Sequence, residues 1–207
     1  MKISMKSLVT AGLIALSCTC SAFATPTVES LATEITQPGG FYTVYLGMPT
    51  SEYQANWSNV PGWTLLQPSK EAVEGEPFMP YHSDAFQRTY SVNGKDVKES
   101  FSVLTSKKHG IVFSFSDTIV SIDQHVIDEI FNEMYEKLKA SYPDLRKAGP
   151  IPGAKPRLSY VKHFGNGNQF VKLSVFDYQK QIKDKGNTDY IMMHSVVVSH
   201  VMMVDLT

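Results

Sequence analysis

The dipeptide Asn93-Gly94 constrains the fold of this chain more than any other sequence feature. It separates two runs, 86–92 and 95–104, that are rich in aromatic and β-branched residues. A two-residue type I′ turn needs positive φ at both central positions, and Asn followed by Gly meets this need well. We therefore predict a β-hairpin whose turn fixes the register. The predicted cross-strand pairs are Val92 with Lys95, Tyr90 with Val97, Arg88 with Glu99 and Phe86 with Phe101.

Further strands are expected after this hairpin. Residues 158–164 and 169–179 flank the glycine-containing tetrapeptide 165–168, which predicts a second hairpin with a longer loop. The last run, 190–206, is apolar on both faces, as in a strand at the middle of a sheet or at a covered edge. The polar stretch 180–189 is expected to be a loop. Shorter strands are expected at 41–46, 63–66 and 111–115.

Two helices are expected. Apolar residues recur at helical spacing over residues 122–142, and a proline follows. Ser121 and Gln124 match a capping box, in which each side chain satisfies the free backbone N–H of the other. A short helix is expected over 50–57, because Pro49 is a helix-start residue.

This order of elements predicts an α+β fold. The expected architecture is an antiparallel sheet built from hairpins, packed on one face by the long helix (122–142) and the short helix (50–57). A single domain is expected over 41–207, with 41–118 and 119–207 as two sub-units in an alternative division. Residues 25–40 are expected to form a polar leader or a short helix.

The first 24 residues have the order of a secretory signal peptide. Lys2 and Lys6 precede the apolar stretch 8–16, and Ala22-Phe23-Ala24 has the small-x-small pattern that signal peptidase cleaves. The apolar stretch is much shorter than the ~20 residues that span a bilayer, and no later segment of the sequence qualifies. We expect cleavage after Ala24 and a secreted or periplasmic bacterial protein.

An alternative interpretation places the protein at a membrane. Cys18 follows Ala15-Leu16-Ser17, which loosely resembles a lipoprotein acylation site and would anchor the chain. Cleavage after Ala24 would instead remove Cys18 and Cys20, the only cysteines, and with them any thiol chemistry. It would also remove two lysines and lower the net charge from −1 to about −3, which argues against nucleic acid as a partner.

The strongest candidate for a metal site is the Met/His run 192–203. Methionine and histidine stand near both of its ends, and these ligands suit copper outside the cytoplasm. In an extended strand the two histidines would share a face but lie about 20 Å apart. No metal or other cofactor is therefore expected, and the residues that would be the ligands of a metal are Met192, His194, His200 and Met203.

The sequence contains no motif of a catalytic nucleophile. It lacks a G-x-S-x-G elbow, and Ser159 and Lys162, which match S-x-x-K, fall in a predicted strand instead of at a helix start. Candidates for a contact surface lie in the proline-rich segment 67–84, which is expected to be a surface loop. They are the apolar and aromatic group Phe78, Met79, Tyr81 and His82.

One segment resembles a known class of proteins. In the run Tyr45-Leu46-Gly47-Met48-Pro49-Thr50-Ser51-Glu52-Tyr53, a strand, a Gly-Met pair and a short helix precede antiparallel strands. This order resembles the opening of small exported α+β domains of the β-lactamase-inhibitor-protein type and of the SmpA outer-membrane assembly lipoproteins. The resemblance implies a non-catalytic protein that binds other proteins through its sheet, and no site residue carries over.

The sequence leaves three functional hypotheses open. The first is an exported, non-enzymatic binding or envelope-associated protein, whose partner is another protein or a component of the cell envelope. The second is an extracytoplasmic hydrolase whose carboxylates or histidines meet only in space. The third is copper or other metal binding through residues 192–203. The sequence gives neither the ligand nor the oligomeric state.

Overall fold

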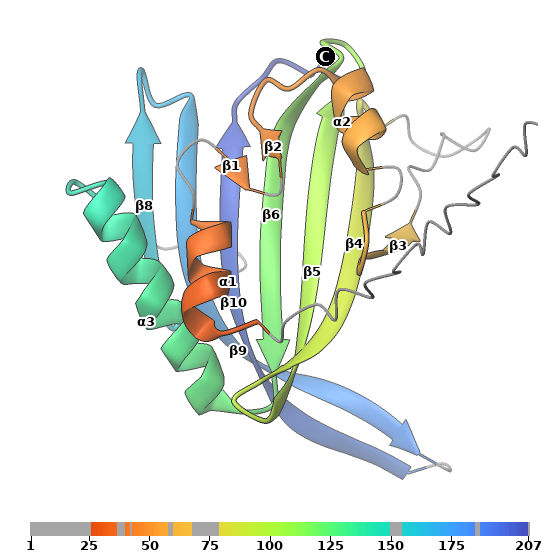
Figure 1. Cartoon of the computed structure of the whole chain (residues 1–207), viewed down its shortest axis with the longest axis vertical. Helices are drawn as coiled ribbons and strands as arrows, with labels where there is room; N and C mark the ends of the chain where they lie inside the picture. The colour runs from red at the N-terminus through yellow and green to blue at the C-terminus, as the bar shows by residue number, and fades with distance from the viewer. Residues whose placement is uncertain are drawn as a thin grey trace, which may run out of the picture.

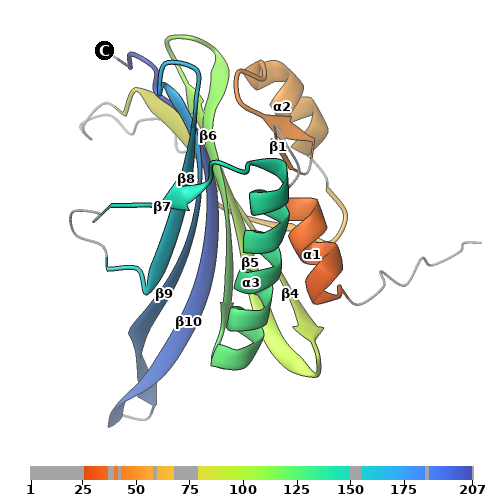
Figure 2. The same cartoon turned by 90° about the vertical axis from the view of Figure 1, so that its left-hand side faces the viewer.

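The computed structural model describes residues 26–36, 40–41, 43–57, 60–67, 79–149, 155–184 and 187–206. These residues form an α+β fold in which helices cover one face of an eight-stranded antiparallel sheet (Figures 1 and 2). The strand order is β3-β4-β5-β6-β10-β9-β8-β7. The strands are β3 (Thr64–Gln67), β4 (Tyr81–Val92), β5 (Lys95–Ser106), β6 (Ile111–Ser121), β7 (Arg146–Lys147), β8 (Leu158–Phe164), β9 (Gln169–Asp184) and β10 (Asn187–Met202). The predicted fold class is confirmed.

The β4–β5 hairpin forms as its turn chemistry predicts. Asn93 has φ 51° and Gly94 has φ 74°, as a type I′ turn requires. The register pairs Val92 with Lys95 and continues through Arg88–Glu99 to Phe86–Phe101. Every cross-strand pair predicted for this hairpin is therefore confirmed.

Strand β10 joins the two halves of the sheet. Strands β3 to β6 pair in chain order on one side of it, and β7 to β9 do so on the other. Over residues 194–201 β10 is paired with β6 as well as with β9, and Val196 and Val198 are buried there. This confirms the expected position at the middle of a sheet.

The prediction of a loop at 180–189 is wrong. Strands β9 and β10 remain paired out to Asp184 and Asn187. The polar composition was misleading, because backbone hydrogen bonds hold a strand pair without apolar side chains on both faces. Residues 178–184 and 187–193 lie beyond the last pairs that β8 and β6 make with their neighbours. Among the described strands, these two segments pair with each other and with no third strand. We call this two-stranded extension the ribbon; it projects at the lower right of Figure 1.

The long helix begins slightly later than expected. Helix α3 spans Gln124–Ser141, and its N-cap is Asp123, whose carboxylate accepts hydrogen bonds from the backbone N–H groups of His125 and Val126. The predicted Ser121–Gln124 capping box is therefore wrong. Strand β6 continues through Ser121, and the Ser121 hydroxyl donates to the carbonyl oxygen of Asp96 instead (2.9 Å).

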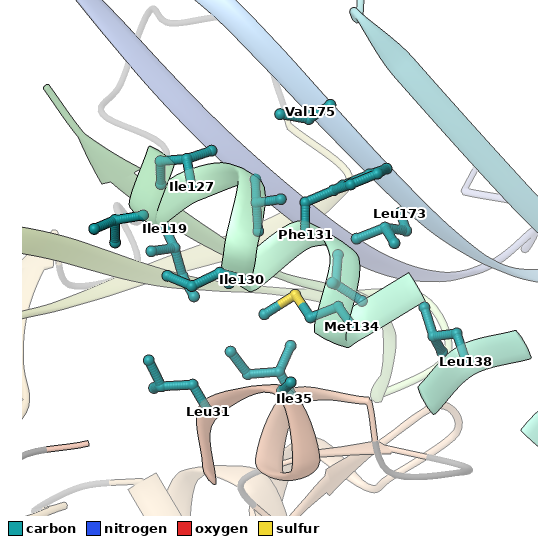
Figure 3. Packing of buried hydrophobic residues seen from close by; sticks show 14 of the residues in the cluster. Leu31, Ile35, Ile119, Ile127, Ile130, Phe131, Met134, Leu138, Leu173 and Val175 are labelled. Atoms are coloured by element: carbon teal, nitrogen blue, oxygen red, sulfur yellow. The ribbon is translucent and has the colours of Figure 1, made fainter. Parts of the chain in front are cut away.

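Two further helices pack on the same side of the sheet as α3 (Figure 2). Helix α2 (Thr50–Trp57) confirms the predicted short helix. Helix α1 (Val28–Ile35) lies within the segment 25–40, and its Leu31 and Ile35 point toward Ile130 and Met134 of α3 (Figure 3). The predicted strand 41–46 is replaced by two short paired strands, β1 (Gly40–Phe41) and β2 (Val44–Tyr45). The positive φ of Thr43 (63°) turns the chain between them.

The described residues form two buried apolar clusters. One lies between α1, α3 and the central strands, and the other lies beneath α2 around Trp57 and Phe101, whose ring centroids are 4.6 Å apart. Among the described residues, no helix is long and apolar enough to cross a bilayer. The two clusters fix the helices to one face and leave the ribbon outside both.

Candidate functional site

The ribbon carries large exposed side chains on both of its faces. Tyr190 is 63% exposed and Met192 is 47% exposed, and both lie on the helix-bearing side of the ribbon. Tyr178 (42%) and Ile182 (38%) lie on the opposite side, because side chains alternate along a strand. The ribbon therefore presents apolar and aromatic surface to solvent in two directions.

Ion pairs hold the base of the ribbon to the rest of the fold. Asp177 of β9 accepts a hydrogen bond from Nδ1 of the buried His194 (2.8 Å) and lies 3.4 Å from Nε of Arg157. Arg157 also binds Asp128 of α3 through both terminal nitrogens of its guanidinium group. The network links β9, β10 and α3 where the ribbon leaves the sheet.

Ser121, His194 and Asp177 lie in register on three adjacent strands. His194 pairs with Ser121 of β6 on one side and with Asp177 of β9 on the other. The order serine, histidine, carboxylate is that of a hydrolase triad. However, the Ser121 hydroxyl donates its proton to the Asp96 carbonyl and accepts the backbone N–H of Asp123 (3.2 Å). The serine therefore caps a turn, and the histidine and aspartate position the ribbon.

The candidate metal ligands of the run 192–203 have separate surroundings. His194 binds Asp177, whereas the ring of His200 stacks on Phe115 with centroids 4.7 Å apart. Burial lowers the pKa of His200 to about 4, so the ring is neutral at pH 7. Met192 lies on the ribbon and Met203 is 68% exposed beyond the end of β10. Within the described part of the chain, no three His, Cys, Asp or Glu side chains are grouped as metal ligands.

The candidate contact residues at 78–82 are only partly surface residues. Phe78 lies outside the described residues, and Met79 is 51% exposed. Tyr81 and His82 do not lie in a loop as expected, since they begin strand β4 and are half-buried. The Tyr81 ring packs edge-on against Phe113 at 6.2 Å. Strand pairing with β5 therefore gives Tyr81 and His82 a packing role.

A polar cluster inside the fold separates the two apolar clusters. The Arg88 guanidinium binds the fully buried Glu99 carboxylate at 2.6 Å and lies 3.7 Å from Glu34 of α1. It also lies over the Trp63 ring, 4.6 Å from the ring centroid. Asp117 of β6 is buried next to this group, and neither of its oxygens accepts a hydrogen bond from an amide, hydroxyl or basic group of the described residues.

The chemistry of Asp117 follows from its surroundings. Burial and the nearby carboxylate of Glu99 raise the pKa of Asp117 well above its ordinary value, and the charge of Arg88 offsets this only in part. A protonated Asp117 can donate a hydrogen bond to Glu99, so that one proton serves both carboxyl groups. Glu99 and Asp117 are themselves buried in the fold, so we expect this pair of carboxyl groups to affect stability.

A shallow groove of about 600 Å³ lies between the start of α1 and α3. Its walls carry several acidic side chains, but two of these already have basic neighbours: Glu129 lies 3.3 Å from His125, and Glu133 lies 3.2 Å from Lys137. The groove residues are Thr27, Val28, Glu29, Asn93, Glu129, Asn132, Glu133 and Glu136. Neither His194 nor Asp177 is among the described residues that line the groove.

The sequence interpretation missed the ribbon as a surface. The even spacing of Tyr178 and Ile182, and of Tyr190 and Met192, places each pair on one face of a strand and was the signal that could have revealed strands there. No family model, curated protein or solved structure matches this chain.

Proposed function

We propose that this protein is an exported, non-enzymatic binding protein that recognises a macromolecular partner through the ribbon. The observation that carries the proposal is the exposure of Tyr178, Ile182, Tyr190 and Met192 on a strand pair that extends beyond the sheet. Tyrosine and methionine are enriched at protein interfaces, where a large apolar body and a polar or flexible end favour tight contacts. The partner is another protein or a component of the cell envelope.

The surroundings of the ribbon support recognition more than chemistry. The salt-bridge network of Asp177, Arg157 and Asp128 holds the ribbon base, so that its exposed side chains are presented in a fixed direction. Such pre-organisation reduces the entropy that is lost on binding. The histidine and serine nearest to this base already have structural hydrogen-bond partners.

Photo-cross-linking in the producing cell tests the proposal. A photoreactive phenylalanine analogue is placed at Tyr178 or at Tyr190, one on each face of the ribbon. The matched control is Tyr45, which has the same exposure as Tyr178, 42%, but lies on β2 at the far end of the molecule (Figure 1). The expected result is a cross-linked adduct with the same molecular mass from both ribbon positions. Tyr45 should give no adduct.

Formation of the adduct must also depend on the exposed side chains of the ribbon. With the cross-linker at Tyr178, replacing Ile182 by Asp should abolish the adduct, because the new charge would be desolvated at the interface. Replacing Glu136, an exposed residue of α3, by Lys should leave it unchanged. Equal adducts from Tyr45 and the ribbon, or none from the ribbon, would refute the proposed function.

A further inference from the structure

Along one edge of the ribbon, backbone groups at known positions have no partner strand in the described part of the chain. The backbone N–H of Met203 donates to the carbonyl oxygen of Asn168 (2.7 Å), and β9 and β10 stay in one register from there to Asn187. Because bonding alternates along an antiparallel strand, the odd-numbered residues of β10 bond to β9. The N–H and C=O groups of Thr188, Tyr190 and Met192 therefore point away from β9. Strand β6 ends at Ser121, opposite His194, and no other strand of the described residues pairs with these groups.

This edge differs from the other edges of the sheet. The outer strands β3 and β7 have only four and two residues, and short edge strands are a common protection against pairing with another chain. Strand β9 carries Lys180 along its side of the ribbon. The β10 side reads Thr188-Asp189-Tyr190-Ile191-Met192-Met193, without lysine, proline or register shift. It therefore lacks three common protections against strand addition and carries one charged residue, Asp189.

From this edge we infer that β10 pairs with β10 of a second copy of the chain, antiparallel and about a two-fold axis at Tyr190. In this arrangement Tyr190 faces Tyr190 of the second copy, and Thr188 faces Met192. The outward backbone groups of these residues then form about six hydrogen bonds. Strand β10 of the second copy then lies on the same side of β10 that β6 occupies beside residues 194–201.

The side chains of the edge are self-complementary in this register. Asp189 faces Ile191 of the second copy, so the two aspartates are not placed opposite each other, which would be destabilising. On the other side of the pair, Tyr190 meets its own copy, and this buries the most exposed aromatic ring of the ribbon. The complementarity to an identical strand favours a second copy over an unrelated peptide. The contact is short, so we expect a weak dimer, at the low end of specific interfaces.

This inference goes beyond the proposed function, since it concerns the backbone edge and an identical partner. Sedimentation equilibrium of the purified protein, from roughly 1 μM to 1 mM, measures the dimer directly. Tyr190→Pro removes one outward N–H and should weaken dimerisation at least tenfold. The matched control is Gln181→Pro, because Gln181 pairs with Tyr190 across the ribbon and its N–H points to the opposite edge. This control should dimerise like the unmodified chain.

A disulfide test does not depend on tolerance of proline. In the full chain with Cys18 and Cys20 replaced by serine, Tyr190→Cys should give a covalent dimer on mild oxidation. Facing Cα atoms of a hydrogen-bonded pair lie about 5.5 Å apart, within the reach of a disulfide. Gln181→Cys should stay monomeric, because three strand spacings would separate its sulfurs by about 14 Å.

The outcomes separate this inference from the proposed function. A chain that is monomeric at every concentration, or equal loss of dimer in Tyr190→Pro and Gln181→Pro, overturns the inference. Equal disulfide yields at the two cysteine positions also overturn it. An adduct of foreign mass from Tyr178 would still support the proposed function in that case. A dimer without any such adduct would support the inference alone.

Discussion

Replacing Asp117 by Asn tests whether the interior polar cluster holds a proton. Asparagine has nearly the same shape and can donate to Glu99 without ionising. The native pKa of Asp117 is raised by burial and by Glu99. Between the ordinary value of about 3.9 and the raised value, the folded state holds one proton more than the unfolded state. Asp117 therefore makes stability fall as pH rises, by about 1.4 kcal/mol per pH unit.

His200 has the opposite effect over part of the same range. Burial lowers its pKa to about 4, whereas an unfolded histidine titrates near 6.5. Between these values the folded state holds one proton fewer, so stability rises with pH by the same ~1.4 kcal/mol per unit. In the unmodified protein the two contributions have opposite signs and offset each other at every pH where both groups contribute. In Asp117→Asn the contribution of His200 remains, and stability should rise by about 3 kcal/mol between about pH 4 and 6.5.

Urea unfolding followed by circular dichroism, at half-unit steps from pH 4 to 8, measures these slopes. His200→Phe keeps the ring stacked on Phe115 but cannot titrate, and its stability should fall with pH from about 4 upward. Glu136→Gln, on the exposed face of α3, controls for the loss of one carboxylate. The reasoning is refuted if Asp117→Asn follows the pH dependence of the unmodified protein, or if its stability falls as pH rises.

Three other substitutions should change the free energy of unfolding, measured by the same method at pH 7. Arg88→Met removes the partner of the buried Glu99 and should cost about 3–5 kcal/mol; adding Glu99→Met should recover most of this loss. Leu31→Ala should cost about 2–5 kcal/mol, because Leu31 is 1% exposed between α1 and α3; a loss below 0.5 kcal/mol would show that α1 does not dock there. Gly94→Ala should cost about 1–2 kcal/mol because of its positive φ, whereas Gly149→Ala, which has open space and no positive φ, should be nearly neutral.

Local chemistry made much of this fold predictable from sequence. Asn93-Gly94 fixes both the turn and the register, so the contact of Arg88 with Glu99 could be stated before any coordinates were known. The long helix was equally predictable, because its apolar residues recur at one spacing. The start of the helix was not, since the end of β6 decides whether Ser121 or Asp123 is the cap.

The exact register and extent of strand pairing explain what the sequence could not give. The proximity of Asp117 and Glu99 depends on the β5–β6 register, which shifts at Leu104/Thr105. A shift of one residue moves every following side chain to the other face. The ribbon was missed for a related reason, because its strands are stabilised by each other's backbones and its polar residues resemble those of a loop.

The place of β10 also determines the order in which the sheet can be completed. This strand comes later in the chain than every strand of the sheet, yet it lies between β6 and β9. Until it arrives, β6 presents an open edge with the hydrogen-bonding groups of its whole central stretch unsatisfied. Folding that depends on such distant pairing is slow. During synthesis from the N-terminal end, the sheet would thus remain incomplete until residues 187–202 had been added.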